Sequence, residues 1–196
     1  MRNIYIKLFE EFSQSSQSKS TCQSVWETLT KKGTLPKQGK SLILMGNEQK
    51  LYLLENGKII DTIIVSTSAK GFGTSGESGQ TPTGLFKTGN VIVGKLYEVI
   101  ISKKPTGTIL GQNTSSTRVD KDGKKHTAEV LTGLIELHGE EPHNKNTFSR
   151  SIYIHGTNRE SNLGKPASGG CIRVANDKII ELSGKIPSGT PLYIQA

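Results

Sequence analysis

A histidine and a cysteine near the C-terminus are the residues best suited to chemistry. His155 ends a predicted strand, and Cys171 lies 16 residues later. The residues directly before the cysteine are Ser168, Gly169 and Gly170. An imidazole within hydrogen-bonding reach of a thiol can take its proton and make a nucleophile for acyl transfer. Glycines before the nucleophile let successive backbone N–H groups face the developing oxyanion, so this turn suits that chemistry.

Other interpretations of these residues remain open. A histidine at a strand end, or a lone cysteine, is often structural, and a zinc site needs three or four ligands. His126, His138 and His143 are the remaining histidines, but no pair has the short spacing of a metal motif, so we expect no metal. His138 is a second candidate base, although its place after an apolar run favours a structural or surface role. His126 follows two lysines and is expected to be solvated.

Length, charge and hydropathy exclude several classes of protein. The 196 residues fit one domain with a short appendage. The net charge is +8, but the basic residues are scattered and lack the motifs of nucleic-acid readers, so we expect no nucleic-acid partner. No apolar run approaches the roughly 20 residues of a transmembrane segment. Cys22 and Cys171 are too few for a disulfide framework.

The first 40 residues are interpreted as an N-terminal extension with a linker and one amphipathic helix. Residues 1–9 lack the apolar region and cleavage site of a signal peptide, which favours a cytoplasmic protein or a removed export signal. Residues 13–21 are polar and predict a flexible linker. A helix is then predicted up to Gly33, with Ser20 as its cap. Its packing face carries Cys22, Val25, Trp26 and Leu29, so we expect Cys22 to be an inert buried thiol.

From residue 41 onward the sequence is typical of a mostly β domain with one or two short helices. The predicted strands cover residues 41–45, 50–55, 59–66, 85–87, 97–101, 130–137, 151–155, 172–174 and 191–195. Asn56-Gly57 predicts a two-residue hairpin turn. Residues 70–84 predict a long loop that is functional or mobile, and residues 111–127 a polar excursion. A short helix is predicted over 177–183, between Asn176 as cap and Gly184 as stop.

Several motifs occur in the order found in the L,D-transpeptidases with the YkuD fold, and the sequence resembles that family. The family signature is a histidine, a loop and then Ser/Thr-His-Gly-Cys. Here it corresponds to His155-Gly156-Thr157 followed by Pro166-Ala167-Ser168-Gly169-Gly170-Cys171-Ile172-Arg173. The turn Thr81-Pro82-Thr83-Gly84 and the final Gly189-Thr190-Pro191 also fit. The resemblance covers about residues 42–196 and implies a YkuD-like curved β-sandwich, so we place the catalytic domain at 41–196.

The resemblance also implies roles for the site residues. Cys171 is the expected nucleophile and His155 the base, with the carbonyl of Gly156 orienting the imidazole. The oxyanion donors implied are the N–H groups of Gly169, Gly170 and Cys171. No cofactor is implied.

Two further residues and one departure complete the expected site. Arg173 and Ser168 are expected to bind substrate, although Arg173 equally fits a structural ion pair. Gly169 stands where many family members have a second histidine, which leaves a wider cleft beside the oxyanion hole. Because the base corresponds to His155, we expect this difference to affect the acceptor and the rate rather than the reaction class.

The implied substrate is the tetrapeptide stem of peptidoglycan. The enzyme would release the terminal D-alanine and pass the acyl group to the side-chain amine of a second stem, which gives a 3-3 cross-link in the cell envelope or periplasm. With water as acceptor it would be an L,D-carboxypeptidase of cytoplasmic wall-peptide recycling, which the missing signal favours. A binding module would not need the His–Cys pair, and the threonine-rich cysteine motif of a sortase is absent.

Overall fold

The computed structural model describes residues 2–76, 78–92, 115–119 and 125–196, so the strand predicted at 97–101 lies outside the described residues. The two helices described are α1 (Arg2–Lys31) and α3 (Asn176–Lys185). The strands are β1 (Lys40–Met45), β2 (Lys50–Glu55), β3 (Lys58–Ile64), β4 (Gly84–Ile92), β5 (Ser115–Val119), β6 (Lys125–Gly139), β7 (Tyr153–Thr157), β8 (Ile172–Val174) and β9 (Pro191–Gln195). The fold is mostly β, as the resemblance implied.

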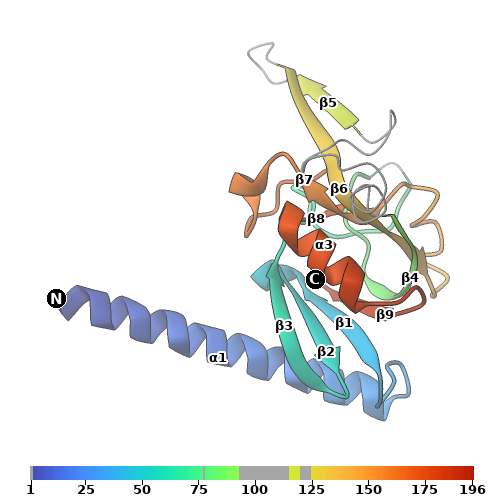
Figure 1. Ribbon diagram of the computed structural model, residues 1–196. Coiled ribbons are helices and arrows are strands. Elements are labelled where there is room, and N and C mark those ends of the chain that lie inside the picture. The colour runs from blue at the N-terminus through green and yellow to red at the C-terminus, as the bar shows by residue number, and fades with distance from the viewer. Residues whose placement is uncertain (1, 77, 93–114, 120–124) are drawn as a thin grey trace.

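The strands form one strongly curved sheet in the order β3-β2-β1-β9-β4-β6-β7-β8, and β5 pairs with β6 beside this path (Figure 1). The hairpin between β2 and β3 turns at Asn56 and Gly57, which both have positive φ, as predicted. Ser66, just beyond β3, exchanges two backbone hydrogen bonds of 2.9 and 3.0 Å with Arg173 in β8. The two ends of the strand order therefore meet, and the sheet nearly closes on itself.

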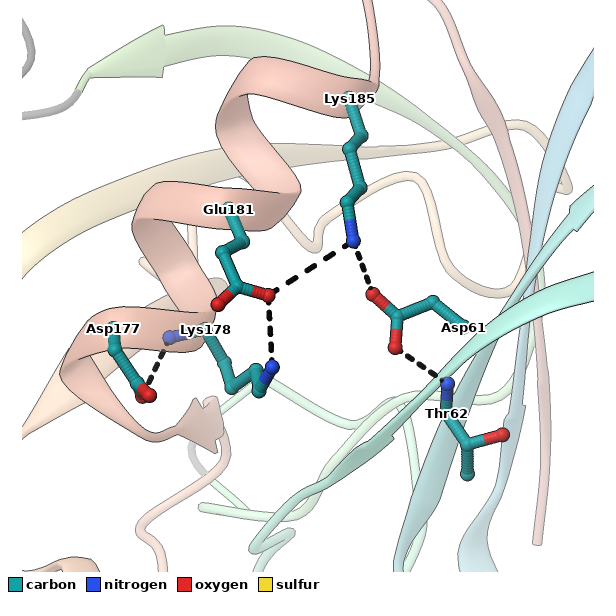
Figure 2. Close-up of polar contacts among 6 residues, drawn as sticks. All are labelled: Asp61, Thr62, Asp177, Lys178, Glu181 and Lys185. Carbon is teal, nitrogen blue, oxygen red and sulfur yellow. Dashed lines mark hydrogen bonds and ion pairs between the residues drawn. The ribbon is translucent and has the colours of Figure 1, made fainter.

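The main hydrophobic core lies inside this curved sheet. Alternate residues of the strands point inward, among them Leu42, Phe86 and Ile154, and none of these three is exposed. Ile179 and Leu182 of α3 complete the core from one side. Lys185 at the end of α3 also forms an ion pair with Asp61 in β3 (Figure 2). This core holds β7 and β8, which carry the candidate site.

A second hydrophobic cluster lies between the outer face of β1 and β2 and the last turns of α1. Cys22 and Leu29 pack there against Ile43, Tyr52 and Leu54, with Val25 and Trp26 partly buried at the edge. Cys22 is fully buried, as expected. Figure 1 shows α1 passing beneath these strands and extending away from them at its N-terminal end.

Three local predictions need correction. Residues 13–21 are helix and not linker, because α1 is a single helix of 30 residues, and Ser20 lies within it rather than capping it. The polar stretch 111–127 contains β5 and the start of β6, which pair with each other. In α3, Asn176 is the first helical residue and Ala175 the cap, and the helix continues through Gly184 to Lys185.

Candidate active site

The parallel pairing of β7 with β8 brings the two reactive residues to the same part of the sheet. Ile154 pairs with Ile172, and His155 pairs with Arg173. Ile154 and Ile172 are fully buried and belong to the main core. Since side chains alternate along a strand, His155 and Arg173 lie on the opposite face. Cys171 directly precedes β8, and neighbouring strands are about 4.8 Å apart.

His155 is a buried, neutral imidazole with one nitrogen already engaged. The residue is 5% exposed, and its Nδ1 lies 2.6 Å from the carbonyl oxygen of Gly156. Burial lowers the pKa of His155 to about 4; the hydrogen bond to Gly156 opposes this shift, and the charge of Arg173 adds to it. Because a carbonyl oxygen only accepts, Nδ1 carries the hydrogen, and Nε2 is left with the lone pair of a base.

Cys171 is a half-buried thiol in its protonated form. Its Sγ donates to the carbonyl oxygen of Ser151 over 3.3 Å. Burial raises the pKa of the Cys171 thiol, while a backbone hydrogen bond from Tyr153 and the charge of Arg173 act to lower it. The thiol and the imidazole are thus both neutral at rest. Cys22 differs, because burial and the charge of Glu48 raise its pKa to about 12.

Residues 168–170 directly precede the candidate nucleophile Cys171, and we call them the nucleophile turn. This turn is fixed by its own hydrogen bonds. Ser168 Oγ donates to the carbonyl oxygen of Cys171 and accepts from Gly170 N at 3.1 Å. The carbonyl oxygen of Gly170 accepts from Thr81 Oγ1 at 2.9 Å. Gly170 has φ of +133°, and a Cβ there would lie 2.6 Å from Ile152 Cδ1, so only glycine fits.

The residues expected to donate to the oxyanion or to bind substrate therefore differ in whether they are already engaged in the turn. The N–H of Gly170 and the hydroxyl of Ser168 already bond to each other inside the turn. A Cβ at Gly169, by contrast, would meet no atom within 4 Å. The position of Gly169, where the family resemblance led us to expect a wider cleft, therefore has free space beside it.

Arg173 is a buried cation beside the thiol. It is 6% exposed, and its Nη1 donates to the carbonyl oxygen of Ala167 at 3.2 Å. Within residues 2–76, 78–92, 115–119 and 125–196, no carboxylate forms an ion pair with Arg173, so the alternative of a structural ion pair finds no partner there. Burial and the charge of Arg159 lower its pKa, and Cys171 raises it, but a guanidinium stays charged.

Of the remaining histidines, the two with described side chains, His138 and His143, do not join this group. His138 stacks on Phe148 with ring centroids 4.8 Å apart, and its Nε2 is 3.5 Å from Glu136. His143 contacts the carbonyl oxygen of Thr83. The side chain of His126 is outside the described part. Among the described side chains, no three His, Cys, Asp or Glu residues gather as metal ligands would.

Sequence reasoning missed two residues outside β7 and β8 that contact Cys171 or the nucleophile turn. Ser151 has a φ of +56°, and its carbonyl oxygen accepts the hydrogen bond of the thiol, but no glycine or asparagine marked this position. Thr81 belonged to a predicted turn motif, but its bond to Gly170 spans 89 residues. These contacts depend on tertiary structure and leave no local signal.

The comparisons with known proteins agree with this fold. The YkuD family profile, described as the L,D-transpeptidase catalytic domain, matches residues 41–194. The Bacillus licheniformis protein YkuD is 49% identical over 100 residues, which are 51% of this chain and 52% of that protein. The Bacillus subtilis protein YqjB is 50% identical over 50 residues, covering 26% of this chain and 28% of that protein. The chain thus spans about half or less of these relatives.

Solved structures show the same fold at low sequence identity. L,D-transpeptidase 3 from Mycobacterium tuberculosis, in complex with a faropenem-derived adduct, superposes with a TM-score of 0.53 and 13% identity over 81% of this chain and 60% of that chain. In the part of the chain that the structure describes, no helix has the length and apolarity of a membrane span. Since the family profile covers most of the sequence, this chain belongs to the YkuD family of L,D-transpeptidase catalytic domains.

Proposed function

We propose that this protein is a cysteine-dependent L,D-transpeptidase acting on the tetrapeptide stems of peptidoglycan. The observation that supports this most is the register of β7 and β8, which places His155 on the strand next to Cys171. The free lone pair on Nε2 gives the imidazole the role of base. We assign catalysis to residues 41–196 and treat residues 1–40 as an extension.

The first step forms a thioester. Nε2 of His155 takes the proton of the Cys171 thiol, and Sγ attacks the carbonyl carbon of the third stem residue. The bond between this carbon and the nitrogen of D-alanine breaks. The nitrogen leaves with the proton held by the imidazolium, so free D-alanine and a neutral imidazole are restored together. Both groups start neutral, so proton transfer accompanies the attack rather than preceding it.

The oxyanion is held by backbone donors of the nucleophile turn. Because Gly170 N already donates to Ser168 Oγ, we assign the oxyanion to the N–H groups of Gly169 and Cys171. Ser168 then acts by holding the turn and not by contacting substrate. This changes two of the roles implied by the family resemblance.

Arg173 supplies the positive charge of the site. A buried guanidinium beside the thiol attracts the free carboxylate of a stem peptide and also lowers the pKa of Cys171. Both effects favour the first step. This assignment gives the buried charge a function beyond its hydrogen bond to the carbonyl oxygen of Ala167.

In the second step an acceptor attacks the thioester carbon and the thiol leaves, recovering its proton through His155. With the side-chain amine of a second stem, the product is a 3-3 cross-link in the cell envelope. With water, the product is a tripeptide, and the protein is an L,D-carboxypeptidase that can act on recycled peptides in the cytoplasm. The open space at Gly169 favours the second candidate, because it leaves room for water beside the thioester.

Mass spectrometry of the purified protein with a disaccharide-tetrapeptide tests both candidates, with Cys171→Ala as control. Loss of D-alanine with a new dimer identifies a transpeptidase, and loss of D-alanine with only tripeptide a carboxypeptidase. A thioester on Cys171 that persists in the wild-type protein indicates slow attack by water. An untouched tetrapeptide with the wild-type protein would contradict the proposal.

A further inference from the structure

Arg150 holds the loop that covers the nucleophile turn. We call residues 71–76 and 78–81 the flanking loop. The half-buried guanidinium of Arg150 donates to four of its acceptors: Gly73 O at 3.3 Å, Gly76 O at 3.1 Å, Ser78 Oγ at 3.1 Å and Gln80 O at 2.8 Å. All three guanidinium nitrogens are used, which only the planar fork of arginine permits. A loop rich in glycine and serine thereby gains a fixed shape.

The flanking loop in turn contacts the nucleophile turn. A Cβ on Gly170 would lie 3.4 Å from Gln80 O and 3.6 Å from Gly79 O. Thr81 Oγ1 donates to Gly170 O, and Ser68 Oγ donates to Gly79 O at 2.6 Å. Gln80 O is thus both an acceptor for Arg150 and part of the wall against Gly170. A shift of this loop would move the residues directly before the nucleophile.

The residue that follows Arg150 in the chain also contacts the proposed nucleophile. This residue, Ser151, accepts the hydrogen bond of the Cys171 thiol. The strained φ of Ser151 is held by Ser151 N donating to Phe148 O at 2.9 Å and by Arg150 N donating to Asn146 O at 3.0 Å. The anchored side chain of Arg150 and the carbonyl that meets the thiol are therefore one residue apart.

From this arrangement we propose that Arg150 is a positioning residue that sets the protonation and placement of the Cys171 thiol. By fixing the flanking loop, Arg150 holds Ser151 where its carbonyl oxygen meets the thiol. The hydrogen bond that the neutral thiol donates to Ser151 O is lost in the thiolate, so Arg150 keeps Cys171 protonated until substrate arrives. The inference rests on the proposed nucleophilic role of Cys171.

The test compares Arg150→Ala and Arg150→Lys with the wild-type protein. The first readout is the pH dependence of Cys171 alkylation by iodoacetamide, followed by peptide mass spectrometry with buried Cys22 as internal reference. We expect Arg150→Ala to shift this profile to lower pH, because the Ser151 contact loosens. The second readout is the rate of D-alanine release from a disaccharide-tetrapeptide. A displacement of about 1 Å can cost a factor of about 100, so we expect a fall of 10-fold or more. Arg150→Lys should lie between the wild-type protein and Arg150→Ala in both readouts.

A matched variant separates positioning of the thiol from simple ordering of the loop. Asn146→Ala removes one hydrogen bond, from Asn146 Nδ2 to Thr74 O, between the same two segments. It should leave the alkylation profile near that of the wild type. An unchanged profile in both Arg150 variants would overturn the inference, even if D-alanine release fell. Alkylation needs no substrate, so a wild-type protein that releases no D-alanine would refute the proposed function without touching this test.

Discussion

At the contact between α3 and β3, four charged side chains pair with one another near the surface (Figure 2). Lys185 pairs with Asp61 and lies 3.9 Å from Glu181, which pairs with Lys178 at 2.8 Å. On the outer face of β7 and β8, His155 and Arg173 are 5% and 6% exposed and, within the described ranges, have no carboxylate in ion-pair distance.

We interpret this difference as one between charges that support the fold and a charge, on Arg173, that we propose acts on the substrate. Exposed pairs are screened by water and contribute little each, but they leave no charge unsatisfied. A buried cation without an anion costs folding energy, because it is desolvated without compensation. We interpret Arg173 as a charge whose partner is the substrate. Variants in the two regions should therefore affect different measurements.

The largest effect is expected from His155→Gln. Loss of a general base typically costs about 10²–10⁴-fold in rate, so D-alanine release should fall by that factor. Cys22→Ala, at a buried thiol of the other cluster, is the control and should keep activity in the folded fraction. A His155→Gln protein within three-fold of wild type would remove the imidazole from the proposed mechanism.

Arg173→Gln should have the next largest effect. Losing a charge-assisted hydrogen bond of about 1.5–3 kcal/mol to a substrate carboxylate lowers D-alanine release by about 10–100-fold. The charge of Arg173 also lowers the pKa of Cys171, so its removal should move the alkylation profile to higher pH. Arg173→Lys retains the charge and should shift the profile less. Equal profiles in the two variants would contradict an electrostatic role.

Gly170→Ala tests the shape of the nucleophile turn. Its φ of +133° and the 2.6 Å approach to Ile152 Cδ1 predict a loss of about 1–3 kcal/mol in the free energy of unfolding. The methyl group of Gly169→Ala would lie in open space, so this variant should change the free energy of unfolding by less than about 0.5 kcal/mol. Urea unfolding of both variants measures the difference. Equal stabilities would mean that the turn tolerates a side chain at both positions.

Asp61→Asn should have the smallest effect, because Asp61 is 19% and Lys185 41% exposed in their side chains. Burial raises the pKa of Asp61, but the hydrogen bond and charge of Lys185 outweigh it, so the net shift is downward. The ion pair therefore stabilises the fold fully at pH values above the ordinary pKa of Asp. This stabilisation is lost as the pH falls through the lowered pKa of Asp61. Unfolding at pH 7 should show a loss of about 0.2–1 kcal/mol.

The same measurement at a pH below the lowered pKa of Asp61 provides the control within the experiment. There Asp61 is protonated in the wild-type protein as well, and the difference from Asp61→Asn should disappear. Glu55→Gln, at an exposed position on β2, should show no such pH-dependent difference. A loss that persisted at low pH would assign the effect to packing rather than charge.

Much of the sheet could be predicted from local sequence because its signals are local. Asn56-Gly57 supplied the positive φ values that a two-residue hairpin needs, and short runs of apolar residues marked the strands around it. The candidate residues His155 and Cys171 could be selected from the sequence, since the glycines before Cys171 indicate a tight turn, and the structure brings their strands side by side. The contacts that hold the nucleophile turn and the flanking loop could not be predicted, because the bonds of Arg150 and Thr81 cross 70 to 89 residues.

The error in α1 has a physical explanation. Residues 13–21 looked like a linker because they are polar, but no glycine or proline occurs before Gly33 to interrupt a helix. Two hydroxyls of α1 bond back to carbonyl oxygens one turn earlier, Thr21 to Gln17 and Thr28 to Ser24, instead of competing with the helix. A polar composition therefore did not mean an irregular backbone.

The packing of α1 allows its docking to be followed by intrinsic tryptophan fluorescence. Trp26 is the single tryptophan, and its ring lies over Gly57, where a Cβ would be 2.4 Å from Trp26 Cη2. Its indole emission therefore reports whether α1 stays docked on the hairpin, at the opposite end of the strand order from β8. Denaturation followed by this fluorescence and by exposure of the Cys171 thiol should coincide if helix and sheet unfold as one cooperative unit. An earlier fluorescence transition would show that the helix undocks while the catalytic sheet is still folded.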